Sequence, residues 1–298
     1  MTREPGRADL TIVHVSDTHL EPRRTEQYAG VNDRLGRIRE EIRALRADLV
    51  VATGDLTNRG SADPGDFALA LEWLTGLDTP YLAVPGNHDL GANPLRGEMF
   101  PHYERYEPVP FHETGYARAF GTDLVPGVTV GPVTVLGVVL REDDPDGALP
   151  QLAEQLRQVE GMVLVAGHYP VIEPRPIPSL EHFGARGYVD RSAERLREVL
   201  AASENVVGYL CGHVHLTSMH PISPRCTQFT AGGLGPGAAS YRSYRIQGDT
   251  LRYGTHEAEG PQVFWEGGSA QARAIPHFSS GTAEERCGVL PLPGHRGR

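Results

Sequence analysis

The chain has 298 residues, 39% hydrophobic and 22% charged, which is typical of a globular protein with a sizeable core and not of a disordered one. Its net charge of −10 and the lack of a basic cluster disfavour a nucleic-acid polymer as partner, and all 28 basic residues are arginine, which excludes lysine-based catalysis. No apolar run reaches the roughly 18 residues of a membrane span, and the N-terminus lacks a signal-peptide core, so we expect a cytoplasmic protein.

Five near-continuous apolar runs predict strands that are buried on both faces: residues 10–15, 48–52, 81–84, 162–166 and 206–210. Between them, apolar residues at spacings of 3 and 4 predict amphipathic helices over residues 35–45, 149–159 and 196–200. Further strand groups are expected within residues 116–140 and 226–253. Two packed sheets with helices outside would accommodate all of these elements.

The C-terminal part has a different composition. We divide the chain into a main domain, residues 1–255, and a Gly/Pro-rich extension, residues 256–298, with no periodic apolar face. The extension is expected to be extended or partly disordered, although Val263-Phe264-Trp265 could dock it. A homodimer contact through the extension and the strands near Tyr241–Tyr253 is left open.

A polar cluster follows each of the five predicted strands. Ligands bind at the carboxyl ends of strands in open α/β folds, so five such ends would converge on one place. A glycine beside each cluster would let the backbone turn sharply and approach a bound species closely. The clusters are Asp17-Thr18-His19, Gly54-Asp55, Gly86-Asn87-His88-Asp89, Gly167-His168 and Gly212-His213-Val214-His215.

Each cluster alone is weak evidence, because Asp-x-His and Gly-His pairs are often structural. His14 lies inside a predicted strand, and we interpret it as a core histidine. In combination, five histidines, three carboxylates and one amide directly follow buried strands, which is not expected by chance. The three cysteines have no CxxC spacing and are expected to be reduced, mostly structural thiols: Cys211, Cys226 and Cys287.

The order Asp-x-His, Gly-Asp, Gly-Asn-His-Asp, His, Gly-His-x-His resembles the calcineurin-like metallophosphoesterase superfamily over about residues 10 to 250. The stretches Val15-Ser16-Asp17-Thr18-His19-Leu20 and Val31-Asn32-Asp33-Arg34-Leu35 are most similar to the class III cyclic-nucleotide phosphodiesterases and related glycerophosphodiesterases. The resemblance implies a four-layer α/β/β/α sandwich of two mixed β-sheets flanked by helices.

The resemblance also implies two metal ions that share Asp55 and flank a bridging hydroxide, which attacks phosphorus in line. His88 would contact the phosphoryl group and assist the leaving oxygen. Imidazole and carboxylate ligands suit two divalent ions or a mixed Fe/divalent pair, drawn from Mn, Fe, Zn or Co. The implied ligands are Asp17, His19, Asp55 and His215 for one ion, and Asp55, Asn87, His168 and His213 for the other.

Two positions depart from the family pattern. Many relatives carry aspartate where this chain has Asn58, which could orient His88 but gives it no charge. We therefore expect His88 to be a weaker general acid and good leaving groups to be favoured. Relatives also commonly show Leu-Asp where Leu136-Gly137 stands, a change that should leave metal binding intact.

The residues around the site would set substrate choice. Besides Asn87 and His88, the candidates for substrate binding are Arg175, Arg186 and His220, although surface arginines are more often only solvated. Aromatic and histidine side chains between residues 92 and 113 could stack a nucleobase or simply pack a loop: Phe100, His102, Tyr103, Tyr106, Phe111 and His112.

Three functions compete on this evidence. The favoured one is hydrolysis of a small-molecule phosphodiester, either a cyclic nucleotide or a glycerophosphodiester. A phosphomonoesterase for a nucleotide or another metabolite would use the same metal core, with extra cationic contacts such as Arg175 or Arg186 pointing inward. A non-catalytic scaffold on the same fold is disfavoured, because no ligand position is lost.

Overall fold

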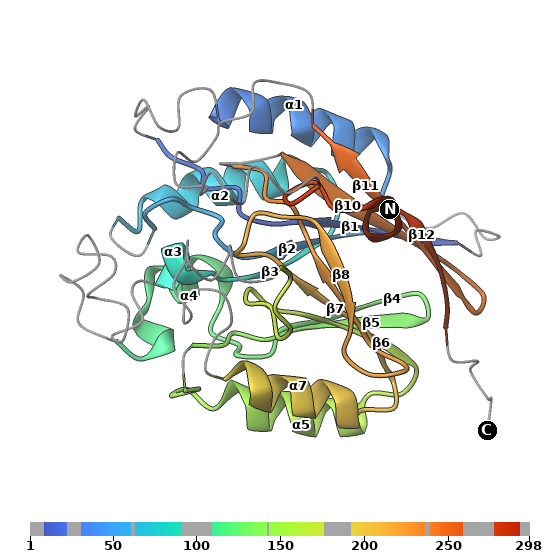
Figure 1. Ribbon diagram of the computed structural model, residues 1–298. Coiled ribbons are helices and arrows are strands. Elements are labelled where there is room, and N and C mark those ends of the chain that lie inside the picture. Colours follow the sequence, from blue (N-terminus) through green and yellow to red (C-terminus); the bar gives the residue numbers. More distant parts are fainter. Residues whose placement is uncertain are drawn as a thin grey trace.

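The computed structural model describes residues 9–22, 31–60, 63–90, 109–141, 143–175, 192–235, 239–258 and 277–292. Two six-stranded sheets pack face to face, and helices cover their outer faces, so that the chain forms four layers (Figure 1). This is the predicted α/β/β/α sandwich.

The first sheet has the strand order β12-β11-β10-β1-β2-β3. Its centre is parallel, because β1 pairs with β2 and β2 with β3 in the same direction, whereas β10, β11 and β12 join by antiparallel pairing. The bounds are β1 Leu10–Val15, β2 Leu49–Thr53, β3 Tyr81–Val84, β10 Ser240–Gln247, β11 Thr250–Glu257 and β12 Gly288–Pro291.

The second sheet has the order β4-β5-β6-β7-β9-β8, with parallel pairing from β5 through β9 and an antiparallel strand at each edge. Its strands are β4 Gly127–Val130, β5 Val133–Gly137, β6 Met162–Ala166, β7 Val206–Cys211, β8 Ser218–Pro221 and β9 Thr227–Thr230.

Helices α1 and α2 cover the first sheet, and α5 and α7 cover the second (Figure 1). Helices α1, α5 and α7 bury the apolar faces that the spacing predicted: Leu35 and Ile38 of α1 and Leu152 of α5 are fully buried. The helical segments are α1 Val31–Ala44, α2 Asp66–Thr75, α3 Asn87–Leu90, η2 Phe111–Glu113, α4 Gly115–Phe120, α5 Ala148–Gln158, α7 Ala193–Ala202 and α9 Ala283–Arg286.

The five predicted buried strands are β1, β2, β3, β6 and β7, each within one residue of its expected end. The strand group expected to begin at Tyr116 starts later, because Gly115–Phe120 forms α4. The side chain of Thr114 caps this helix, and Tyr116 and Phe120 pack against Phe67. Local capping and aromatic packing therefore outweigh the strand preference of the aromatic residues there.

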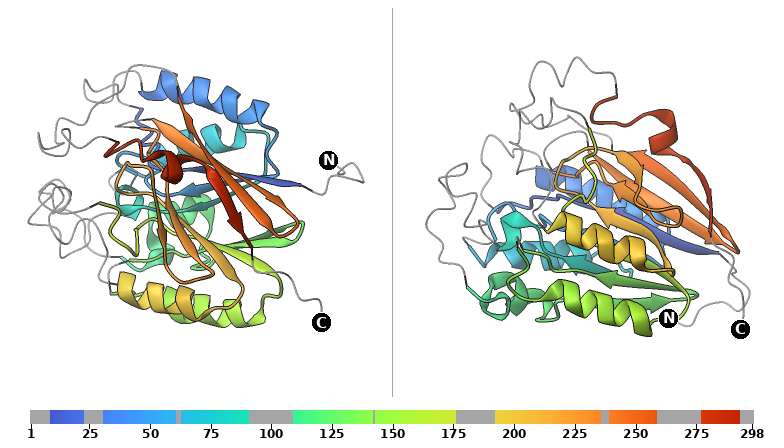
Figure 2. Two further views of the ribbon diagram at one scale, coloured as in Figure 1. Left: turned by 45° about the vertical axis from the view of Figure 1, so that its right-hand side comes forward. Right: turned by 60° about the horizontal axis from the view of Figure 1, so that its bottom comes forward.

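The main-domain boundary placed at residue 255 falls inside β11, and the described part of the extension packs on the body of the protein. Helix α9 contacts β8 and β11, and β12 adds the outer strand beside β11 (Figure 2). Val263-Phe264-Trp265 lies outside the described residues. Within the described ranges, no helix is long and apolar enough to cross a membrane.

His14 and the cysteines are placed as expected. His14 is fully buried in β1, where its Nε2 lies 2.8 Å from the Thr53 hydroxyl and its Nδ1 lies 3.2 Å from the Tyr244 hydroxyl. Burial, together with nearby Arg242, lowers the pKa of His14 to about 3, so it is a neutral core histidine at pH 7. Cys211, Cys226 and Cys287 are free thiols, and the first two are buried.

Candidate dimetal site

The carboxyl ends of β1, β2, β6 and β7 bring acidic and imidazole side chains from both sheets together. Two groups of donors each have their ligand atoms within 4.8 Å of one another. One group is Asp17, His19, Asp55 and His215, and the other is Asp55, His168 and His213. Asp55 belongs to both groups, in agreement with the shared carboxylate that the family resemblance implies.

In the first group, ring nitrogens and carboxylate oxygens face one point. The Nε2 atoms of His19 and His215 are 3.2 Å apart, and the His215 Nε2 is 3.3 Å from the Asp17 carboxylate. The Asp55 Oδ2 lies 3.7 Å from the His19 Nε2. Imidazole and carboxylate donors converging in this way fit a borderline transition-metal cation.

In the second group, His168 contacts both other predicted oxygen donors. Its Nε2 is 3.4 Å from the Asp55 Oδ2 and 3.1 Å from the Asn87 Oδ1. Its Nδ1 donates to the Thr53 carbonyl at 2.8 Å, which fixes the ring and leaves Nε2 for the site. The His213 ring lies 5.0 Å from the His168 ring, centroid to centroid.

The electrostatics keep Asp55 ionised. Burial alone would raise its pKa, but the imidazoles of His168 and His88 hold the pKa well below its usual value. Burial disfavours a charged His168, yet the Asp55 carboxylate outweighs that effect and raises the pKa of His168 to about 9. A metal ion would have to displace this proton, so metal binding should weaken at low pH.

Backbone strain is concentrated in the same residues. Five of the ten described non-glycine residues with positive φ are predicted ligands: Asp17 at 51°, His19 at 44°, Asp55 at 47°, His213 at 71° and His215 at 52°. Each left-handed conformation costs free energy and persists only where the surroundings enforce it, and such residues cluster at functional sites. The strain therefore marks this cluster independently of its chemistry.

Two glycines allow the ligand loops to approach one another. Gly54 has a φ of +92°, which side-chain-bearing residues rarely adopt. A Cβ on Gly86 would collide with the Asp55 carboxylate and backbone nitrogen, and would lie 2.7 Å from the His168 ring. The turn after β3 thus reaches Asp55 only because residue 86 has no side chain.

Asp89 ties the turn after β3 to the turn after β2. Its carboxylate accepts hydrogen bonds from the backbone nitrogens of Gly86, Leu56 and Thr57 at 2.9–3.0 Å. Burial and the nearby Asp55 charge raise the pKa of Asp89 to about 6, against the effect of these bonds. Sequence reasoning gave Asp89 no role, although its place beside His88 in the third cluster was the available signal.

Arg34 supports the loop that carries Asp17, a role the sequence did not suggest. This fully buried side chain of α1 donates to the carbonyls of Leu234 and Gly235. The backbone nitrogen of Gly235 in turn donates to the Asp17 carbonyl at 2.7 Å. Arg34 stands in the second of the two stretches that suggested the subgroup.

His88 is half-buried beside Asp55, and the group that orients its ring differs from the expected one. Its backbone nitrogen donates to the Asp55 carboxylate, and its Nδ1 donates to the main-chain carbonyl of Asn58, both at 2.8 Å. The Asn58 side chain instead donates to the buried Glu21 carboxylate at 2.7 Å. The expectation that the side chain at position 58 orients His88 needs correction, because the main chain makes that contact.

Gly137, the second departure from the family pattern, fills a tight place between the sheets. A Cβ there would lie 2.7 Å from Val84 and 3.0 Å from Pro126. An aspartate at this position would therefore require the Val84 or Pro126 side chain to shift.

Among the residues predicted to bind substrate, Arg175 and His220 contact other protein groups instead. Arg175 pairs with Glu285, and the His220 Nε2 donates to the Pro174 carbonyl at 3.2 Å, so neither placement favours a substrate contact. Phe111 packs in the core and His112 is exposed. Arg186, Phe100, His102, Tyr103 and Tyr106 lie outside the described residues.

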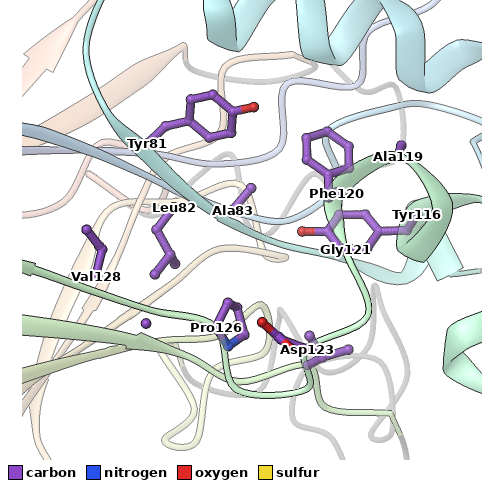
Figure 3. Close-up of a pocket in the computed structure, with 12 residues that line it drawn as sticks. Tyr81, Leu82, Ala83, Tyr116, Ala119, Phe120, Gly121, Asp123, Pro126 and Val128 are labelled. Carbon is purple, nitrogen blue, oxygen red and sulfur yellow. The ribbon is translucent and has the colours of Figure 1, made fainter.

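A cavity of about 230 Å³ lies elsewhere, between β3, α4 and β4 (Figure 3). Tyr81, Leu82, Tyr116, Phe120 and Asp123 are among its lining residues, and no predicted ligand is. The donor cluster, rather than this cavity, is the candidate functional site.

Comparison with known proteins agrees with the geometry. The chain is 28% identical over 220 residues to a probable glycerophosphodiester phosphodiesterase of Arcobacter nitrofigilis, covering 70% of this chain and 73% of the relative. It is 25% identical over 277 residues to the 3',5'-cyclic adenosine monophosphate phosphodiesterase of Escherichia coli, covering 82% and 88%.

Solved structures share the fold. A dimetal phosphatase from Danio rerio superposes with a TM-score of 0.60 at 14% identity, covering 84% of this chain and 96% of that one. A purple acid phosphatase from yellow lupin gives 0.59 at 12% identity, covering 86% and 52%. The family model described as calcineurin-like phosphoesterase matches residues 10–216, which include every predicted ligand. The chain therefore belongs to the calcineurin-like phosphoesterase family.

Proposed function

We propose that the protein hydrolyses a phosphodiester bond of a small molecule, either a cyclic nucleotide or a glycerophosphodiester, with two metal ions. The observation that carries this proposal is the sharing of Asp55: its Oδ2 lies 3.7 Å from the His19 Nε2 of one donor group and 3.4 Å from the His168 Nε2 of the other. A shared carboxylate suits two cations about 3.5–4 Å apart, the spacing of two-metal phosphoesterases.

In this proposal the donors divide as the family pattern implies. Asp17, His19 and His215 hold one ion, and Asn87, His168 and His213 hold the other, with Asp55 common to both. When bound, the ions would supply Lewis-acid activation of the phosphoryl group and of a water nucleophile. Their identity is drawn from Mn, Fe, Zn and Co, since the donor set holds nitrogen and oxygen but no sulfur.

His88 is our candidate for the contact to the phosphoryl group. His88 would make this contact through Nε2, because its Nδ1 donates to the Asn58 carbonyl. A protonated His88 would donate from Nε2 to a phosphoryl oxygen and then give its proton to the leaving oxygen. Its ring lies 4.6 Å from that of His19, which keeps it beside the metal donors.

A diester is favoured over a monoester for two reasons. The relatives from Arcobacter nitrofigilis and Escherichia coli are both named as phosphodiesterases. A monoester also carries an extra negative charge, and Arg175, the described candidate for neutralising it, is committed to Glu285. We infer a small-molecule substrate and not a nucleic-acid polymer, because the chain carries a net charge of −10.

The test is hydrolysis of bis-p-nitrophenyl phosphate beside p-nitrophenyl phosphate by Mn-loaded protein. We expect the diester to be cleaved roughly tenfold faster, and Asp55→Ala to lower kcat by about a thousandfold or more, because that variant damages both metal groups. A preference for the monoester would favour a phosphomonoesterase. Failure to cleave either compound would refute the proposal.

A further inference from the structure

The C-terminal segment, residues 277–287, holds the loop that carries His213 and His215. Thr217 follows His215 by two residues, and both of its backbone groups are engaged. Its nitrogen donates to the Ser279 carbonyl at 2.8 Å, and its carbonyl accepts from the Arg175 Nη2 at 2.8 Å. The segment packs closely here, since a Cβ on Gly281 would lie 2.9 Å from the same carbonyl oxygen.

An ion pair joins this segment to the loop after His168 as well. The Arg175 Nη1 and Nη2 donate to the two Glu285 carboxylate oxygens at 2.7 and 2.9 Å, and its Nε donates to the Phe278 carbonyl at 2.9 Å. The two side chains are only 11% and 13% exposed. A bidentate pair with this little solvent is among the stronger and more directional side-chain contacts.

Glu285 is itself held in place, so its ion pair with Arg175 can fix the position of Thr217. Its carboxylate accepts from the Thr282 nitrogen at 2.8 Å in a capping box at the start of α9. Its carbonyl accepts from the Nη2 of the fully buried Arg242 at 2.6 Å, and Arg242 also donates to the Ser218 carbonyl of β8. Glu285 is therefore anchored independently of Arg175.

We propose that Arg175 and Glu285 are positioning residues that fix His215 for metal binding. The inference rests on the proposed function, in which His215 is a ligand. His213 and His215 both have positive φ, a conformation that costs free energy and needs enforcement from outside the loop. The anchored pair supplies that enforcement at Thr217. Without it the loop can relax, and the group formed by Asp17, His19, Asp55 and His215 loses a well-placed donor.

The experiment is calorimetric titration of Mn²⁺ into the full chain and four variants. We expect Arg175→Ala and Glu285→Gln each to weaken one of two Mn²⁺-binding steps about tenfold and to leave the other step within about twofold, as loss of support around a ligand does. The double variant Arg175→Ala/Glu285→Gln should lose little more than either single change, because the two residues act as one unit.

Arg286→Ala is the matched control. It lies beside Glu285 on α9 and pairs with Glu257 at 2.6 Å, but that pair is more exposed and joins α9 to β11 instead of to a ligand loop. It should bind Mn²⁺ as the parent does. If Arg175→Ala does not fold, Arg175→Lys, which retains the charge but not the bidentate geometry, takes its place and should also weaken the step.

The outcomes separate the two proposals. A parent that binds two Mn²⁺ ions and variants that bind them equally well would overturn the positioning role and leave the proposed function intact. An increased KM for the diester at saturating Mn²⁺, with unchanged Mn²⁺ affinity, would make Arg175 a substrate contact and also overturn it. A parent that binds no Mn²⁺ would overturn both.

Discussion

The two halves of the candidate site are built in different ways. The half from the first sheet, with Asp17, Asp55 and Asn87, is fixed mainly by main-chain contacts: the Asp17 nitrogen donates to the Gly54 carbonyl, and the Asp89 carboxylate binds three nitrogens in two turns. The half from the second sheet is held by contacts between side chains far apart in the sequence, chiefly the ion pair of Arg175 and Glu285. Turns after neighbouring strands, with Arg34 supporting the loop of Asp17, thus shape one half, and the C-terminal segment holds the other.

The largest effect is expected where the first half is most crowded. Gly86→Ala would force a Cβ against Asp55, and we expect it to destabilise the protein by about 3 kcal/mol, as overpacking in a rigid site does. Gly36→Ala, inside α1 with no atom within 4 Å of the added Cβ, should instead stabilise it by about 0.5–1 kcal/mol. Urea unfolding measures the free energy of unfolding of both variants. Equal values would mean that the turn after β3 can move away from Asp55 at little cost.

His14 tests the comparison further, because it packs within the first sheet against β2, the strand that leads into Asp55. It contacts the hydroxyl of Thr53, the residue whose carbonyl orients His168. The pKa of His14 is lowered to about 3 from 6.5, so unfolding takes up a proton below pH 6.5. Its contribution to stability is complete above that pH and declines as the pH falls toward 3.

We expect this loss to be about 2 kcal/mol between pH 6.5 and pH 5, from 1.36 kcal/mol per pH unit. Urea unfolding at the two pH values measures it. His14→Gln is the control, since glutamine does not titrate, and its stability should fall by about 2 kcal/mol less than that of the parent. Equal pH dependence in the two proteins would show that His14 is protonated in the folded state.

Asn58 offers the smallest effect and tests how the first half orients His88. Because the main-chain carbonyl makes the contact, Asn58→Asp should change kcat for the diester by less than about fivefold. The new carboxylate would face Glu21, and we expect it to cost about 1 kcal/mol of stability. A large gain in kcat, above all with poor leaving groups, would show that the side chain at position 58 charges His88 after all.

The sequence predicts the donors of both halves better than the contacts that hold them in place. Strand ends, glycines and the residues beside them are encoded locally, so the donors that follow the five buried strands, from Asp17 to His215, could be placed together from apolar runs and turn signals. The contact between Asn58 and His88 could not, because a sequence pattern shows side chains and not which carbonyl a ring will meet.

Arg175 shows why the long-range contacts could not be predicted. From the sequence it was a cationic candidate for the substrate, and its partner Glu285 lies 110 residues away in a segment expected to be extended or partly disordered. Nothing in the local pattern predicts that β12 joins the first sheet and brings α9 against β8. Arg34 and Arg242 were missed for the same reason, since each binds carbonyls from a distant loop.

The central claim is that one carboxylate, Asp55, joins the two halves around two metal ions. Electron paramagnetic resonance of the protein titrated with Mn²⁺ tests it most directly, because two Mn²⁺ ions about 3.5–4 Å apart are spin-coupled. We predict a coupled spectrum at two equivalents in the parent and its loss in Asp55→Ala. Two uncoupled signals, or saturation at one equivalent, would contradict the account.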